Sequence, residues 1–393
     1  MQEKTAPPTP RLEDRILAVL SRNAVPVFFA VLCLGGIIAA RLDINFLVNE
    51  VLARLGRNSI LVLSLLIPVM AGLGLNFGIV IGAMAGQIAL IIITHYRLTG
   101  LTGICTAALL AIPFALLFGW LTALVLNKAK GREMVTGMIL GFFANGLYQL
   151  VFLVLTGTVI PIKDEMLLLS SGIGVRNTVD LINVAGSLDR ALDFLWNGLI
   201  LVNWGPLRLG PWRVPVFTLV LTGLVCAATS FLIRTRLGQQ MRAVGQDSRI
   251  AEVAGINVDR IRTTAIIIST ILASWGQLVF LQNIGTMNTY NSHEQVGMFA
   301  IAALLVGGAT TRRATIWNAL IGVLLFHTLF VVSPLAGQKI FGIPQVGEYF
   351  RVFLAYGVIA VALALHAWQS SLRRKTAKQH GEKENSLESR PQD

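Results

Sequence analysis

Residues 101–126 read LTGICTAALLAIPFALLFGWLTALVL and carry no Asp, Glu, Lys or Arg. About 20 apolar helical residues suffice to cross a hydrocarbon layer of roughly 30 Å. Lipid cannot satisfy free backbone groups, and the stretch is too long and too weakly alternating for a barrel strand, so we expect a transmembrane helix. The whole chain agrees, because 54% of its 393 residues are hydrophobic, 13% are charged and its mean hydropathy is +0.70.

Similar apolar runs lie on both sides of this stretch and bring the expected number of spans to about ten. They cover 24–40, 59–75, 78–94, 134–156, 214–233, 263–283, 296–310, 314–332 and 350–368. The chain is therefore predicted to be an all-α integral membrane protein with its transmembrane domain at 24–368. A cytoplasmic segment is expected at 1–23, and a disordered cytoplasmic tail at 369–393, where apolar residues are scarce.

Positive charge gathers beside the spans. Short loops rich in Lys and Arg stay on the cytoplasmic side of a membrane. The clusters at 128–132, 234–262, 312–313 and 373–375 all fall on that side if the amino terminus is cytoplasmic. We therefore expect both termini in the cytoplasm, and the net charge of +12 gives no reason to expect a nucleic-acid partner. The connection 41–58 falls on the extracytoplasmic side in this topology. Its three arginines disagree with that placement, because arginine-rich loops favour the cytoplasmic side.

The charged segment, residues 234–262, reads RTRLGQQMRAVGQDSRIAEVAGINVDRIR. Its pattern predicts two short helices separated near Gly245 and stopped at Gly255, with apolar residues spaced along them. Such a pair fits a groove on a soluble partner. An amphipathic segment that only bridges two spans at the membrane surface is the alternative. The apolar residues are Met241, Val244, Ile250, Val253 and Ala254.

The spans 59–75 and 78–94 are short and rich in breaks. Pro68 lies in the first, and glycines follow from Gly72 through the GAMAG run at 82–86. Broken helices at membrane depth need shelter in protein or beside a water-lined cavity, which favours a transport path. Close helix packing through small residues explains the same glycines, and both interpretations remain open.

A long polar insertion occupies 157–213 and falls on the extracytoplasmic side. Within it SLDRALDFLWNGLILV, residues 187–202, has the spacing of an amphipathic helix at an interface. Trp196, Trp204 and Trp212 suit the headgroup level. A loop of this length is typical of a functional or partner-binding segment, with a purely structural cap as the alternative.

The sequence offers no catalytic or metal-binding pattern. It lacks GxxxxGK[ST], HExxH and GxSxG, and its three cysteines have no metal-ligand spacing. We therefore expect no catalytic residue, no metal and no cofactor bound by the chain itself. The spans also contain no securely placed charged residue, which disfavours an ion-coupled carrier and a membrane-embedded enzyme, and indicates that energy arrives from a partner.

Uncharged amides are the main polar groups of the spans. They either join helices or contact a neutral, hydrogen-bonding solute. We take Asn76, Gln87, Asn145 and Gln149 as candidates for a solute path. The remaining amides of the spans are Gln277, Gln282, Asn283 and Asn318.

From about residue 60 to 365 the chain resembles the permease subunits of bacterial ABC importers of the branched-chain amino acid, ribose and nucleoside type. Four pieces carry the resemblance. They are GLNFGIVIGAMAG at 74–86, REMVTGMILGFFANG at 132–146, LGQQMRAVGQDSRIAEVAGINVDRIR at 237–262 and AIAALLVGGATTRRATIWNALIGVLLF at 300–326. The first departs from the family's form, since Val80 and Ile81 stand where an acidic or polar residue is common.

The resemblance implies that the charged segment docks on an ATPase subunit that binds ATP and Mg²⁺. It also implies a second permease subunit, identical or different, an extracytoplasmic solute-binding protein, and a place in the bacterial inner membrane. A simple sugar or nucleoside is favoured as solute, because Glu133 is kept in the second piece; branched-chain amino acids, or a self-contained secondary carrier, are the alternatives. The positions that match the family's coupling pattern are Arg242, Ala243, Gly245, Ala251, Gly255 and Ile256.

Overall fold

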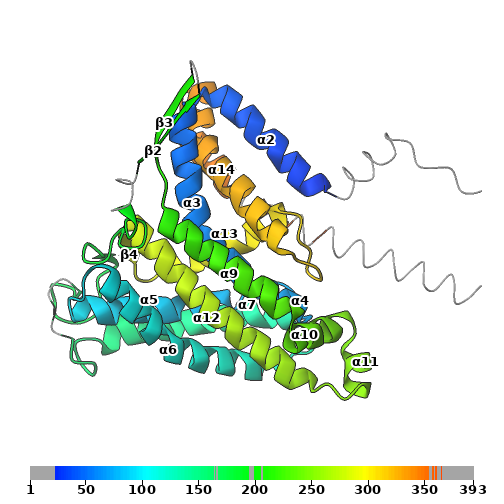
Figure 1. Cartoon of the computed structure of the whole chain (residues 1–393). Helices are drawn as coiled ribbons and strands as arrows, with labels where there is room; N and C mark the ends of the chain where they lie inside the picture. The colour runs from blue at the N-terminus through cyan, green and yellow to red at the C-terminus, as the bar shows by residue number, and fades with distance from the viewer. Residues whose placement is uncertain are drawn as a thin grey trace, which may run out of the picture.

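The computed structural model describes most of the chain as a bundle of helices (Figure 1). The predicted terminal segments 1–23 and 369–393 lie almost wholly outside the described residues, as does part of the predicted span 350–368, so these boundaries stay predictions. The described residues are 23–162, 164, 167–193, 199–204, 207–353, 356–357, 359–360 and 364.

Helices account for nearly all of the described architecture. In chain order they are α2 (Ala24–Ala40), α3 (Ile44–Ser64), α4 (Leu66–Met70), α5 (Ile79–His95), α6 (Gly100–Lys128), α7 (Glu133–Leu150) with the π-turn η1 (Val151–Leu155), α9 (Val216–Arg234), α10 (Arg236–Gln246), α11 (Ser248–Val253), α12 (Val258–Ile284), α13 (Ser292–Val306) and α14 (Ile316–Phe341). Residues 344–353 are also helical. Among the described residues, six stretches are long and apolar enough to cross a membrane and three more helices are apolar but shorter, which confirms the predicted fold class.

Two short antiparallel sheets accompany the helices. Strand β1 (Thr178–Asp180) pairs with β4 (Thr286–Asn288), and β2 (Leu199–Trp204) pairs with β3 (Leu207–Arg213). The pairing of β1 with β4 ties the insertion, residues 157–213, to the connection between α12 and α13.

The connections gather at two ends of the bundle. At the insertion end, the Gly100 N–H donates to the Asn183 carbonyl and the Leu181 N–H donates to the Gly285 carbonyl. At the opposite end, called the α10–α11 end, Lys130 pairs with Asp259 at 2.8 Å. Helix α12 runs between the two, from β4 to α10 and α11 (Figure 1), and packs on α3, α5 and α6.

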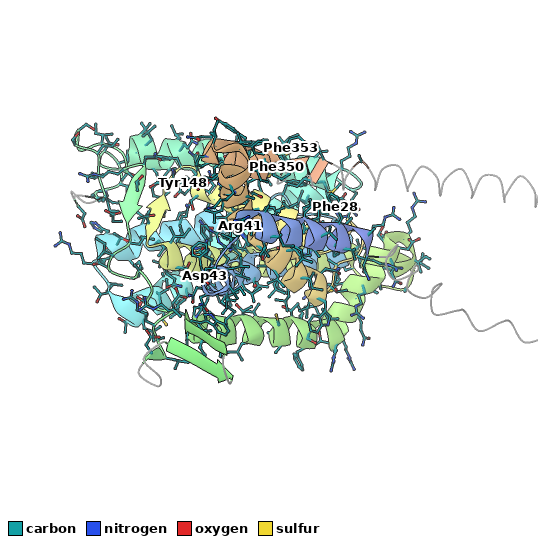
Figure 2. All side chains as sticks on the ribbon, turned by 90° about the horizontal axis from the view of Figure 1, so that it is seen from above. Phe28, Arg41, Asp43, Tyr148, Phe350 and Phe353 are labelled. Atoms are coloured by element: carbon teal, nitrogen blue, oxygen red, sulfur yellow. The ribbon has the colours of Figure 1, made fainter. Side chains whose placement is uncertain are left out.

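The connection predicted over 41–58 is wrong, because α3 begins at Ile44. Asp43 caps this helix by accepting a hydrogen bond from the Asn45 N–H, and Arg41 and Asp43 lie at the turn after α2 (Figure 2). The two later arginines are accommodated within the helix. Arg54 pairs with Glu50 one turn earlier, at 3.2 Å, and Arg57 donates to Asn283 of α12.

The glycines of the predicted spans 59–75 and 78–94 divide into two groups. Gly72 and Gly74 have φ of +77° and +72° and shape the irregular residues 71–78 between α4 and α5. Helix α5 is unbroken. A Cβ on Gly82 would lie 2.7 Å from the Ala273 Cβ, and one on Gly86 2.6 Å from the Ser274 carbonyl oxygen, so these two serve close packing on α12.

The amphipathic helix predicted over 187–202 is wrong at both ends of its range, while Asp193 is helical and 194–198 lie outside the described residues. Residues 187–192 form turns, and Leu199–Trp204 is a strand. The β-branched residues Ile200 and Val202 favour extended backbone. The Trp212 indole donates to Asn45 of α3 at 3.0 Å, so this tryptophan anchors the hairpin to the bundle.

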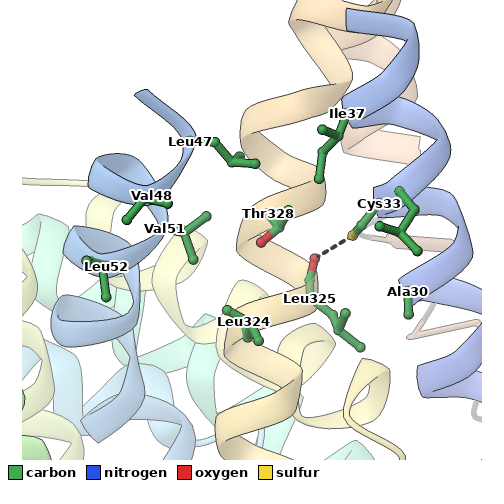
Figure 3. Close-up of a pocket in the computed structure, with 11 residues that line it drawn as sticks. Ala30, Cys33, Ile37, Leu47, Val48, Val51, Leu52, Leu324, Leu325 and Thr328 are labelled. Carbon is green, nitrogen blue, oxygen red and sulfur yellow. Dashed lines mark hydrogen bonds between the residues drawn. The ribbon is translucent and has the colours of Figure 1, made fainter. Parts of the chain in front are cut away.

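The lateral surface is apolar, as lipid contact requires. Phe28, Phe350 and Phe353 are exposed on it (Figure 2). An apolar groove of about 500 Å³ opens between α2, α3 and α14 (Figure 3). The Cys33 thiol donates to the Leu325 carbonyl there at 3.3 Å, and Thr328 supplies the lining hydroxyl. A groove with this lining is unsuited to a polar solute.

Candidate coupling and solute sites

Helix α10 lies with one face against the bundle. The Thr235 hydroxyl caps it by accepting from the Gly238 N–H, and Met241 and Val244 are buried. A Cβ on Gly245 would overlap the Met70 carbonyl oxygen, so the backbone of α10 touches the end of α4 directly. The expectation that Met241 and Val244 share an outward docking surface is therefore wrong, because they hold the charged segment to the bundle.

Helix α11 presents the outward apolar surface of the charged segment. Asp247 caps it by accepting from the N–H groups of Arg249 and Ile250, at 2.8 and 3.1 Å. Ile250 is 68% exposed and Val253 is 91% exposed, on a helix that also carries the exposed Arg249 and Glu252. An exposed apolar pair on a capped helix is typical of a protein-binding surface.

The six residues that match the family's coupling pattern fall into supporting and outward-facing positions. Ala251 is buried, and Ala243, Gly245 and Ile256 are partly buried. Arg242 and Gly255 are exposed. Gly255 has φ of +82° with open space around its Cα, so backbone conformation rather than crowding requires glycine at the end of α11.

A second site lies among α5, α7 and α13. The buried His293 places Nδ1 at 2.7 Å from the Gln87 amide oxygen and Nε2 at 2.9 Å from the Asn145 amide oxygen. The Asn145 amide donates to the Glu294 carboxylate. These four residues, Gln87, Asn145, His293 and Glu294, form the polar cluster.

Two buried groups beside the polar cluster have unused hydrogen-bonding capacity. The Tyr148 ring packs on His293 with centroids 5.1 Å apart, and its hydroxyl has no partner within the described structure. Gln277 donates to the Ser292 hydroxyl at 3.2 Å, while its Oε1 atom is likewise unpartnered. Buried polar atoms are nearly always satisfied, so these two have capacity for a further hydrogen bond.

The structure joins two of the four amides chosen as solute-path candidates. Gln87 and Asn145 meet through His293. Asn76 accepts from the Gly78 N–H at 3.0 Å and closes the turn before α5, so it lies apart from the cluster. Gln149 is partly buried on α7, directly after Tyr148. The role of all four in transport stays a prediction.

The expectation that the spans lack ionisable groups is wrong. Arg57 donates to Asn283 at 2.8 Å, and Asn283 donates to Asp189 of the insertion at 2.7 Å. His293 and Glu294 open α13. The sequence hid them because Arg57 fell in a presumed loop, and the His-Glu pair followed the polar run at 286–292. Within the described residues, no group of three or more His, Cys, Asp and Glu side chains is placed to hold a metal ion.

This arrangement is that of a multi-pass membrane protein, with an apolar helical bundle, a polar cluster within it and an exposed apolar pair at one end. Residues 47–363 match the family described as the permease component of the branched-chain amino acid transport system. The chain belongs to this family, which confirms the resemblance drawn from the four sequence pieces. The family is a transport component, so the expectation that the chain is not an enzyme is confirmed as well.

Named relatives resemble the chain over part of its length. The nucleoside ABC transporter permease protein NupC of Lactococcus lactis is 27% identical over 176 residues, 43% of this chain and 52% of that protein. The fructose import permease protein FrcC of Rhizobium meliloti is 26% identical over 182 residues, 46% and 48% of the two chains. The branched-chain amino acid permease protein LivH of Salmonella typhimurium is 28% identical over 181 residues, 44% and 56%. The chain thus spans about half the length of these relatives, and no solved structure matches it.

Proposed function

We propose that the chain is the membrane-spanning subunit of an ATP-driven importer, and that an ATPase subunit docks on α11. The observation that supports this most is the exposed pair Ile250 and Val253, carried on a helix that is capped by Asp247 and held to the bundle through Ala251. ATP and Mg²⁺ belong to the ATPase in this proposal. The chain supplies a bundle whose conformational equilibrium its partners bias.

A chain of contacts connects α11, where the ATPase docks in this proposal, to the polar cluster. Helix α10 touches α4 through Gly245, and Gly72 follows α4 at the start of the irregular residues 71–78. Those residues lead into α5, which carries Gln87. A displacement of the charged segment therefore changes the position of an amide that contacts His293.

The solute in this proposal is a small molecule with several hydroxyl groups, a simple sugar or a nucleoside. The polar cluster and its neighbours supply amide, imidazole and phenol groups that both donate and accept hydrogen bonds. Relatives named for nucleoside and fructose transport support the same class.

Branched-chain amino acids are the second candidate, and Glu294 is the observation that favours them. Its partly buried carboxylate is suited to an ammonium group, and an amino acid needs such a partner for its zwitterion. The LivH relatives bear the corresponding name.

Two further partners and an orientation complete the proposal. Helix α7 with η1 is 17% buried over its most apolar window and exposes Val135, Ile139 and Phe142, which suits a second permease subunit, identical or different. The insertion receives a solute-binding protein. The α10–α11 end and both termini face the cytoplasm, since positive charge gathers there, and the membrane is the bacterial inner membrane.

The test begins with gentle solubilisation from the native membrane, purification by a tag and identification of the co-purifying proteins by mass spectrometry. Recovery of a phosphate-loop ATPase and a solute-binding protein supports the importer. The recovered complex is then placed in lipid vesicles and supplied with ATP and labelled fructose, uridine or leucine, which separates the solute classes. Accumulation by the chain alone, without ATP, overturns the proposal in favour of a secondary carrier.

A further inference from the structure

An ion pair between a buried arginine and a largely buried glutamate, whose side chain is 13% exposed, joins the charged segment to α7. Arg262, in the second turn of α12, is 5% exposed, and its Nη2 atom lies 2.6 Å from Glu133 Oε1 at the start of α7. The same Nη2 donates to the Leu126 carbonyl of α6 at 3.4 Å. Three helices therefore meet at one guanidinium group, at the point where the charged segment returns to the bundle.

Stability alone gives a weak reason to bury these charges. The desolvation of a buried ion pair offsets much or all of its attraction. Arg262 Nε is also buried without a partner, which adds to the cost. The neighbouring pair Lys130–Asp259 joins the connection between α6 and α7 to the first turn of α12 at 2.8 Å, while both side chains remain more than half exposed. The chain therefore has an exposed ion pair in this region, and it keeps the costlier pair Arg262–Glu133 beside it.

The buried pair sets the position of a helix that few other contacts hold. Only 17% of the most apolar 18-residue stretch of α7 and η1 is buried, whereas 61% of the corresponding stretch of α12 is buried. Along α7, Met134 contacts Gly74 near the α10–α11 end, and Asn145 and Tyr148 contact His293 farther on. Any shift of α7 along its axis moves Asn145 relative to His293.

We propose that Arg262 and Glu133 are a positioning pair, which transmits displacement of the charged segment to α7 and so to the polar cluster. This inference rests on the proposed function, because the displacement comes from a docked ATPase. Neither residue lies in the polar cluster. Their role is to make α7 follow the first turns of α12 when the charged segment moves.

The experiment compares Arg262→Gln and Glu133→Gln with the matched control Asp259→Asn, which breaks only the exposed pair. Each variant is assembled with the co-purifying ATPase and binding protein in lipid vesicles. ATP hydrolysis and solute accumulation are measured together, using whichever of fructose, uridine and leucine the wild-type complex accumulates. We expect both neutralised variants to keep ATP hydrolysis and lose about tenfold in solute moved per ATP, a loss within the usual range of coupling between sites. Asp259→Asn is expected to match the wild type.

The double variant Arg262→Glu with Glu133→Arg guards against misfolding. Restored transport per ATP in this swap supports a pairwise role. So does a double variant, Arg262→Gln with Glu133→Gln, whose loss of transport per ATP is no larger than that of either single variant. Unchanged transport per ATP in Arg262→Gln overturns the inference, as does a loss of hydrolysis and transport in equal proportion, which indicates a merely structural role. A wild-type complex with neither ATP hydrolysis nor accumulation refutes the proposed function instead.

Discussion

Gly245 and Gly255 bracket α11, and the structure predicts that the same change strains different parts of the backbone at the two positions. In Gly245→Ala the new methyl group overlaps the Met70 carbonyl oxygen and approaches the Gly72 backbone at 3.1 Å. Backbone cannot move aside as a flexible side chain does, so α10 must lift from α4. Overpacking of this kind costs about 1–3 kcal/mol. In Gly255→Ala the methyl group meets open space, and the φ of +82° costs about 1–2 kcal/mol.

The expected losses of stability in Gly245→Ala and Gly255→Ala overlap, so stability alone does not separate them. The assay must also show which residues are strained. Thermal unfolding of each purified variant in detergent gives the loss of stability. Hydrogen exchange of the amides in residues 71–78 gives the location, because these residues follow α4 directly. We expect faster exchange there in Gly245→Ala and wild-type exchange in Gly255→Ala, whose strain is confined to the end of α11. Both variants are expected to insert in the membrane, since each lies outside the long apolar stretches.

Coupling of ATP hydrolysis to the solute is expected to suffer in Gly245→Ala and in a third variant, Gly255→Leu, for different reasons. Gly245→Ala displaces the support of α11, and Gly255→Leu alters the backbone that leads from α11 into α12, so solute-stimulated ATP hydrolysis should fall in each. Equal, wild-type exchange at residues 71–78 in both alanine variants would show that α10 does not bear on α4. Normal stimulation in Gly255→Leu would remove Gly255 from the coupling residues.

Three further changes test other parts of the structure. Val253→Asp, on a 91% exposed side chain, should leave stability within about 0.5 kcal/mol of wild type and weaken ATPase binding about tenfold or more; pull-down with unchanged affinity would contradict docking on α11. Asn145→Leu should lower solute uptake more than tenfold, because Glu294 and His293 lose their shared partner; uptake equal to the wild type would count against the polar cluster. Asn283→Ala should cost about 1.5 kcal/mol in thermal unfolding, since Arg57 and Asp189 lose the amide between them, and no loss would show that water replaces it freely.

The sequence predicted the long apolar helices well, because their signal is local. Residues 101–126 lie wholly within α6, and hydrophobicity over one helix length decides that assignment. The start of α3 could not be found in the same way. Arg54 and Arg57 made the segment resemble a loop, and the partners that accommodate them are Glu50 one turn away and Asn283 more than two hundred residues later.

The candidate solute site was predicted in part for the same reason. Gln87 and Asn145 were chosen as amides inside apolar runs, a property each shows on its own. His293, which joins them, follows a polar stretch and gains its importance from two partners on other helices. Pairings of this kind depend on the tertiary arrangement, so a pattern along one chain does not contain them. The charged segment was found by its composition, but only packing shows that Met241 faces inward and Val253 outward.

The contacts of α12 explain how one helix can serve both ends of the bundle. Its middle packs on α5 at Gly82 and Gly86, where a Cβ would lie less than 3 Å from Ala273 or from the Ser274 carbonyl oxygen, and its Trp275 indole donates to the Ala108 carbonyl of α6 at 3.1 Å. Its ends carry specific polar links, Arg262 to Glu133 at one and Asn283 to Arg57 at the other. Packing through glycine opposes a small shift of α12 along its axis only weakly. Hydrogen bonds, in contrast, form or break at defined positions. Helix α12 is therefore hydrogen-bonded to α7 at one end, to α6 in its middle and to α3 at the other end, so movement of any of these helices along α12 breaks a defined hydrogen bond.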